Sequence, residues 1–319
     1  MKIDVHNHAF PAEALDLLRR EAVYGVTLTG SHWHGGKHVD FEIVPAFVEP
    51  EAKLAELEAK GLDGALVSVA PPLLYHHVDA DAGEQMARTA NAGLRAIVDA
   101  APDRFGWLAT VPLQDVERAV AVLEEARRDG AVGVQIATTV AGRPLDDEGL
   151  DPFWAAAERL GLPVTIHPAY NEPHRGMDDF YFANVIGNQL ETTIAIERLI
   201  AAGTLARHPG LRIVLVHAGG YFQWQAGRLR HARTVRPELA DSPGPWEALD
   251  QLWFDTITHD RGALRFLLEQ VGAERVVMGT DLPFDMATPE PVSELLAATD
   301  EATARTVAEV NPARLYGLG

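Results

Sequence analysis

Short apolar runs recur along the whole chain, and each is separated from the next by a longer stretch in which apolar and polar residues mix. The runs are rich in Val, Ile and Leu and show no strict alternation, which is typical of parallel strands buried on both faces. We therefore predict eight strands, at residues 1–8, 65–69, 105–111, 132–136, 164–167, 211–217, 252–255 and 275–279.

Almost every predicted strand is followed by a predicted helix. Several of these helices end at a glycine, because glycine readily adopts the left-handed conformation that closes a helix. Eightfold alternation of strand and helix predicts an α/β fold, a (β/α)8 TIM barrel, formed by one domain that spans residues 1–319. An open, doubly wound sheet fits less well, because no glycine-rich phosphate loop follows the first strand.

Residues 24–50 interrupt this pattern after the first strand and helix. The segment contains several glycines and three closely spaced histidines, His32, His34 and His38, but no periodic apolar spacing. A loop of this length inside a compact domain is usually functional or disordered. We interpret the insertion as a mobile, lid-like loop over a pocket. The alternatives are a second metal site formed by its histidines and a plain surface loop.

The composition limits the classes of partner. The net charge is −19 at pH 7, which disfavours nucleic acids and anionic membranes, because their phosphates would be repelled. No apolar stretch is long enough to span a membrane and the N-terminus has no signal-peptide pattern, so we expect a cytoplasmic protein. The chain contains no cysteine, so any metal ion must be bound by nitrogen and oxygen ligands.

Potential metal ligands stand at the C-terminal ends of predicted strands. His6 and His8 are two residues apart, which places both side chains on one side of the first strand. His167 ends the fifth strand, His217 ends the sixth and Asp281 follows the eighth. Because these ends meet at the face of a barrel that carries active sites, we predict that the five side chains converge. Taken singly, each is equally compatible with an ordinary polar residue where a strand meets a loop.

Several segments make the sequence similar to a known group of enzymes. Together with the N-terminal His-Asn-His, they make the chain resemble the metal-dependent amidohydrolase superfamily, in its aminocarboxymuconate-semialdehyde decarboxylase-like branch. The similarity extends over nearly the whole chain. It is densest at residues 133–136 (Gly-Val-Gln-Ile), 155–160 (Ala-Ala-Ala-Glu-Arg-Leu), 191–196 (Glu-Thr-Thr-Ile-Ala-Ile), 217–220 (His-Ala-Gly-Gly) and 279–284 (Gly-Thr-Asp-Leu-Pro-Phe).

The resemblance implies a site built around one divalent metal ion. His6, His8, His167 and Asp281 would hold the ion, for which Zn²⁺ is expected and Mn²⁺ is the alternative. His217 would lie beside the ion as a catalytic acid or base, with Asp281 as a second catalytic candidate. Three imidazoles, one carboxylate and an open position suit a first-row divalent ion.

The implied activity is non-oxidative decarboxylation of a small unsaturated or aromatic carboxylic acid. Two alternatives would use the same ligands to activate water: a hydrolase of a lactone, amide or ester, and a hydratase. A barrel-fold binding protein with a structural metal is the non-enzyme alternative. In the resembled branch an arginine binds the substrate carboxylate across a homodimer interface, and Arg228 matches it. Another arginine of that branch has no counterpart here, where residues 42–47 read Glu-Ile-Val-Pro-Ala-Phe.

Overall fold

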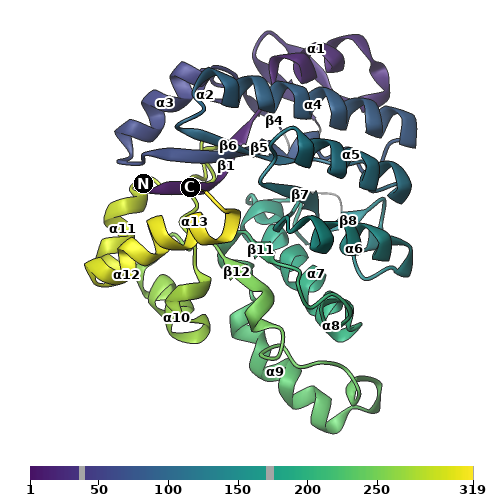
Figure 1. Ribbon diagram of the computed structural model, residues 1–319, viewed down its shortest axis with the longest axis vertical. Helices are drawn as coiled ribbons and strands as arrows, with labels where there is room; N and C mark the ends of the chain where they lie inside the picture. The colour runs from purple at the N-terminus through teal and green to yellow at the C-terminus, as the bar shows by residue number, and fades with distance from the viewer. Residues whose placement is uncertain (36–39, 170–175, 319) are drawn as a thin grey trace.

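Seven parallel strands form the central sheet, in the order β1-β5-β6-β7-β10-β11-β12. The structure is a computed structural model that describes residues 1–35, 40–169 and 176–318. At least one helix connects each strand to the next, which allows neighbouring strands to run parallel (Figure 1). The seven strands are β1 (Ile3–Ala9), β5 (Gly64–Val69), β6 (Phe105–Ala109), β7 (Gly133–Ala137), β10 (Val164–His167), β11 (Ile213–Leu215) and β12 (Leu252–Phe254).

The barrel closes between β12 and β1 through residues 276–282. Phe254 forms an isolated parallel bridge with Val276. On the other side, the backbone N–H of Val5 donates a hydrogen bond to the carbonyl of Met278 at 2.9 Å. The predicted (β/α)8 fold is therefore confirmed. The eighth position is an irregular segment rather than a regular strand, because it pairs with its neighbours through isolated bridges.

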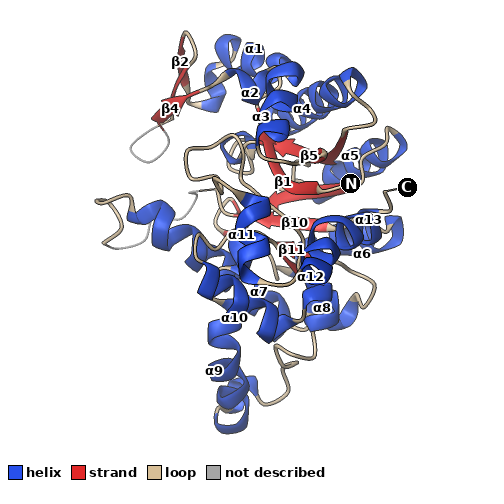
Figure 2. Ribbon diagram, turned by 90° about the vertical axis from the view of Figure 1, so that its left-hand side faces the viewer, coloured by secondary structure: helices blue, strands red, loops and turns tan. Residues whose placement is uncertain are grey.

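Helices cover the outer side of the barrel (Figure 2). Among the described residues, no helix is long and apolar enough to cross a membrane. In both views α9 extends away from the barrel (Figures 1 and 2). The helices are α1 (Ala12–Arg20), α3 (Pro50–Ala59), α4 (Ala80–Ala100), α5 (Val116–Arg128), α6 (Asp151–Leu160), α7 (Gln189–Ala201), α8 (Thr204–Arg207), α9 (Phe222–Val235), α10 (Arg261–Val271), α11 (Pro291–Ala298), α12 (Glu301–Arg305) and α13 (Asn311–Tyr316).

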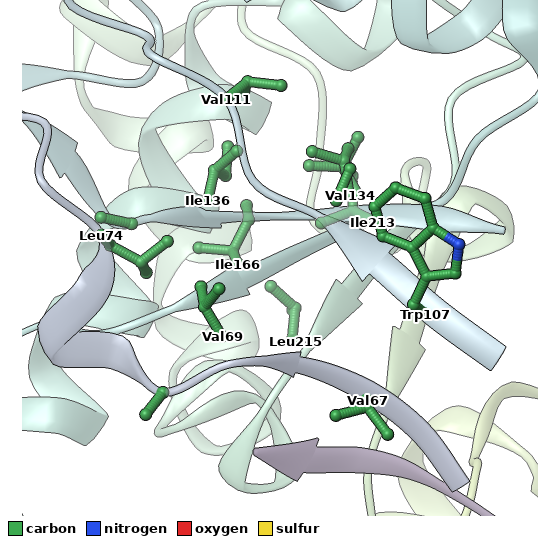
Figure 3. Close-up of a cluster of buried hydrophobic side chains, with 14 of the residues drawn as sticks. Val67, Val69, Leu74, Trp107, Val111, Val134, Ile136, Ile166, Ile213 and Leu215 are labelled. Carbon is green, nitrogen blue, oxygen red and sulfur yellow. The ribbon is translucent and has the colours of Figure 1, made fainter. Parts of the chain in front are cut away.

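Two hydrophobic clusters hold the barrel together. The larger contains apolar side chains of both the strands and the outer helices. Figure 3 shows part of it, with Val67, Val134, Ile166 and Leu215 contributed by four different strands. The smaller cluster combines side chains of β1, β5, β6, β11 and β12 with α13 residues. This packing fixes the strand ends that carry the polar residues described below.

The described part of the inserted segment contains secondary structure that the sequence analysis did not predict. It contains the antiparallel strands β2 (Thr27–Thr29), β3 (His32–His34) and β4 (Asp40–Glu42), followed by the short helix α2 (Pro45–Val48). Strands of three residues are too short to give a recognisable alternation in the sequence. That the insertion moves as a lid remains a prediction, and His38 lies outside the described residues.

Candidate metal centre

All five predicted side chains meet at the C-terminal side of the barrel. His6 and His8 lie on β1, His167 ends β10, His217 follows β11 and Asp281 lies in the closing segment. The Nε2 atom of His6 lies 2.9 Å from Nε2 of His8 and 3.1 Å from Nε2 of His167. Oδ1 of Asp281 is 3.0 Å from Nε2 of His8 and 3.4 Å from that of His6. Residues more than 270 positions apart in sequence thus surround one point.

The rings of the three histidines predicted as ligands are each held by an acceptor on the side away from the converging atoms. Nδ1 of His6 lies 2.8 Å from a carboxylate oxygen of Asp255, while Nδ1 of His8 and of His167 face backbone carbonyl oxygens at 3.2 and 2.6 Å. A proton on each Nδ1 satisfies these acceptors and leaves each Nε2 with a lone pair directed inward. Converging lone pairs repel one another unless a cation lies between them, so the donor set fits a divalent metal ion.

Burial favours the neutral form that metal ligation needs. It lowers the pKa of His8 to about 4 and holds the pKa of His167 well below its usual value. Both imidazoles are therefore neutral at pH 7 and can bind a metal ion without first losing a proton.

Asp281 is the anionic member of the site. Its backbone N–H donates to the carbonyl of His6 at 2.9 Å. Its φ of 67° lies in the left-handed region, a conformation that costs a non-glycine residue roughly 1–3 kcal/mol and is often found at functional sites. Burial opposes ionisation of the carboxyl, but the imidazoles of His217 and His8 hold its pKa well below the usual range. The group is therefore a carboxylate at neutral pH.

His217 differs from the other three histidines in how its ring is held. Its Nε2 lies 3.6 Å from Oδ2 of Asp281, and its ring centroid lies 5.2 Å from that of His167. Distance alone therefore does not separate it from the ligand set, since its ring nitrogen, like those of His6 and His167, lies within 4.8 Å of the Asp281 carboxylate. However, its Nδ1 has no hydrogen-bond partner in the part of the chain that the structure describes. Among the described residues its ring is therefore held only at Nε2, by the Asp281 carboxylate, and not from the Nδ1 side as the other three rings are.

Asp255 organises the site, and the sequence analysis missed it. It is fully buried just after β12 and orients His6. The same carboxylate accepts hydrogen bonds from the backbone N–H groups of His217 at 2.9 Å, Ala218 at 2.7 Å and Ile257 at 3.1 Å. These bonds stabilise the left-handed turn at His217, where φ is 53°. Asp255 ends the seventh predicted strand, so the rule that identified the other site residues would have found it.

A buried lysine lies behind β1. Lys53 on α3 is 1% exposed, and its Nζ donates to Oδ1 of Asn7 and to the carbonyl of His8, both at 2.7 Å. Asn7 in turn donates to Asp4, which also accepts from the Thr280 hydroxyl at 2.6 Å. Burial lowers the pKa of Lys53 to about 8 and raises that of Asp4 to about 6. The network ties the His6–His8 strand to α3 and to the residue before Asp281.

A cavity large enough for a small aromatic acid opens beside the five converging polar side chains, His6, His8, His167, His217 and Asp281, which are called the barrel cluster below. It has a volume of about 660 Å³ and is lined by His217 and Asp281, with Trp224 among its apolar walls. A smaller cavity of about 130 Å³ shares these two polar residues and extends to His167. The buried side chain of Asn188 lines both cavities, and its Oδ1 has no hydrogen-bond partner among the described residues. This amide is thus available to a bound molecule.

Arg228 is not part of this site within its own chain. It is exposed on α9 and lines neither cavity. A role in binding substrate therefore requires that it reach the site of a second subunit.

Comparison with known proteins gives the family. The amidohydrolase profile matches residues 3–318. The chain belongs to the amidohydrolase family. The predicted resemblance is confirmed, and the match includes every residue of the cluster.

Several proteins similar to this amidohydrolase are decarboxylases. It is 28% identical to 2-amino-3-carboxymuconate-6-semialdehyde decarboxylase of Dictyostelium discoideum, over 100% of this chain and 92% of the relative. The crystal structure of 5-carboxyvanillate decarboxylase from Sphingomonas paucimobilis superposes with a TM-score of 0.85 at 26% identity, covering 99% of both chains. That of dihydroxybenzoic acid decarboxylase from Polaromonas, with bound manganese, gives a TM-score of 0.80 at 20% identity, over 99% of this chain and 97% of the other.

Proposed function

We propose that this amidohydrolase is a metal-dependent, non-oxidative decarboxylase of a small aromatic or unsaturated acid with a neighbouring hydroxyl, enol or amine group. The observation that carries the proposal is that three Nε2 atoms converge with the Asp281 carboxylate, and that this carboxylate and the neighbouring His217 imidazole line a cavity. Its relatives of known activity carry out the same class of reaction on acids of this kind.

In this proposal His6, His8, His167 and Asp281 bind one divalent ion. When bound, the ion supplies Lewis-acid chemistry, orienting the acid and its neighbouring oxygen. Zn²⁺ suits three imidazoles and one carboxylate, and Mn²⁺ is the alternative because a Polaromonas relative binds it. A structural ion would normally be closed by four ligands without a spare acid or base, so a non-catalytic role fits the site less well.

Residues of the chain would supply the proton that the reaction consumes. Breaking the bond between carbon and carboxylate releases CO2 and leaves the electron pair on the carbon. That carbon must then receive one proton, for which His217 and Asp281 are the candidates, directly or through water. The two groups lie 3.6 Å apart and both line the cavity. They could therefore pass a proton between them before delivery.

We further propose that the functional unit is a homodimer in which Arg228 binds the substrate carboxylate in the partner's site. α9 extends from the barrel (Figure 1), and its Trp224 and Val235 side chains are 71% and 58% exposed. Exposed apolar side chains on a projecting helix suit a protein interface. An arginine can bind a carboxylate through two parallel hydrogen bonds.

A substrate panel tests the activity. Hydroxy- and aminobenzoic acids and unsaturated enol acids are incubated with enzyme loaded with Zn²⁺ or Mn²⁺, and released CO2 is measured. Lactones, amides and esters are assayed in parallel for hydrolysis. We expect turnover of one or more acids with stoichiometric CO2 and its loss with a chelator. Turnover of only the lactones, amides or esters would overturn the decarboxylase proposal in favour of a hydrolase that uses the same residues.

A further inference from the structure

The small sheet of the insertion carries a second group of metal-binding side chains. Nε2 of His32 lies 2.6 Å from Oδ1 of Asp40, and Nδ1 of His34 lies 2.9 Å from Oδ2 of the same carboxylate. The two imidazole centroids are 4.5 Å apart. One ligand atom from each residue falls within 4.8 Å of the others. Residues 1–35, 40–169 and 176–318 contain two groups of potential metal ligands, the barrel cluster and this one.

The strand pairing holds these side chains in place. His32 and His34 are two apart on β3, so both project from the same face of the sheet. Asp40 on β4 lies directly opposite His34 in the antiparallel register. The intervening Trp33 projects from the other face, where it is 2% exposed and packs against Phe10. Burial of the indole fixes the rotation of β3 and therefore presents both imidazoles to solvent on the same side.

We propose that His32, His34 and Asp40 form a second, solvent-accessible site for a divalent transition-metal ion. Two imidazole nitrogens and one carboxylate oxygen are ligands that Zn²⁺, Ni²⁺ and Cu²⁺ prefer, and Mg²⁺ and Ca²⁺ do not. Both histidine side chains are accessible to solvent, at 41% and 42% exposure, which leaves the remaining coordination positions to water. The ion would replace the two His–Asp contacts with direct bonds and clamp β3 to β4.

The site shares no residue with the barrel cluster but contributes to the wall of a cavity beside it. Asp40 also lines the smaller cavity, together with His167 and Asp281. An ion bound by Asp40 would thus add positive charge to the wall of a cavity next to the barrel cluster, which favours an anionic molecule there.

Ni²⁺ binding to the metal-loaded enzyme tests the proposal. Wild-type protein, His34→Gln and His231→Gln are dialysed against the same Ni²⁺ concentrations, and bound nickel per chain is measured by elemental analysis. His231, an exposed histidine on α9, is the matched control. We expect one more Ni²⁺ per chain in wild type and His231→Gln than in His34→Gln, whose affinity for this ion should fall roughly tenfold or more. Equal nickel content in all three proteins would overturn the site.

Quenching of tryptophan fluorescence by Cu²⁺ tests whether the second ion binds at β3. Trp33 lies between the two histidine ligands, so an ion on the opposite face of β3 is close to its indole. We expect Cu²⁺ to quench part of the emission of wild-type protein, and this part to be lost in both His34→Gln and Trp33→Phe. His34 is solvent-exposed, so this variant should keep the wild-type far-UV circular dichroism. Undiminished quenching in His34→Gln would contradict the assignment.

Discussion

Asp255 accepts the Nδ1 hydrogen of His6 at 2.8 Å, and this bond determines which nitrogen of His6 faces the other ligands. The two residues are 249 positions apart in sequence, on strand ends that the closing segment separates. Asp255 also accepts the N–H of His217, so one buried carboxylate positions both a proposed ligand and the proposed acid or base. In metal sites, such outer partners of ligating histidines contribute strongly to affinity.

Asp255→Asn should weaken metal binding. The amide cannot accept the Nδ1 hydrogen of His6 and at the same time satisfy the N–H groups of His217 and Ala218. We expect an affinity loss of about 10- to 100-fold, measured by competition with a chromophoric chelator. Asp16→Asn, on the exposed side of α1, is the control. Wild-type metal affinity in Asp255→Asn would show that the hydrogen bond between Asp255 and His6 does not contribute to metal binding.

His6→Ala combined with His8→Ala should remove the ion. Both Nε2 atoms of the proposed ligand set are lost, and the remaining donors are too few to hold a divalent ion tightly. Elemental analysis is expected to give about one ion per chain in wild type and almost none in the variant. A full metal complement in the double variant would exclude these residues as ligands. Because any ion at the second site is exposed, dialysis against a weak chelator precedes the measurement.

His217→Asn should retain the ion but lose activity. If His217 transfers a proton, its removal should lower turnover by roughly 10²-fold or more. Metal content is measured on the same samples as kcat. Loss of metal as complete as in the His6 and His8 variant would instead make His217 a ligand, an outcome its short distances to the cluster allow.

Arg228→Ala and His217→Asn proteins should complement each other when mixed. Each is expected to be nearly inactive alone. After dissociation and reassembly about half of the dimers are hybrids, and each hybrid has one intact site if Arg228 acts across the interface. Activity should then return to roughly a quarter of wild type. Mixing that restores nothing would mean that Arg228 does not act on the partner's site.

Glu197 on α7 should make stability depend on pH. Burial raises the pKa of its carboxyl to about 7, and neither oxygen has a hydrogen-bond partner among the described residues. A raised folded-state pKa means that stability is highest below the unfolded value near 4.5 and falls as the pH rises through about 7. Glu197→Gln should therefore change little at pH 5 but raise the free energy of unfolding at pH 8, by at most about 3 kcal/mol.

Urea denaturation of wild type and Glu197→Gln at the two pH values measures this difference. Glu148→Gln, at a more exposed position before α6, corrects for the general effect of removing one negative charge. Equal stabilisation by both substitutions would mean that burial of Glu197 contributes nothing.

The sequence by itself determined the barrel and five of the polar side chains that converge at its C-terminal side, but not Asp255, which orients His6 among them. Strand and helix patterns are local, and eight alternating repeats leave few other topologies. In that topology the strand ends must meet. The sequence was therefore enough to predict that five side chains lie close together: His6, His8, His167, His217 and Asp281.

The tertiary structure alone decided what surrounds those residues. The tautomer of His6 depends on Asp255, and the support of β1 depends on Lys53, a residue that its helical sequence context gives no reason to bury. The insertion's sheet and the eighth position of the barrel were also not predictable in detail, since their strands are too short to show a period. Contacts of this kind depend on register and side-chain packing between segments distant in sequence. A local pattern can place a residue at the end of a strand, but it cannot predict which atoms of distant segments will contact that residue.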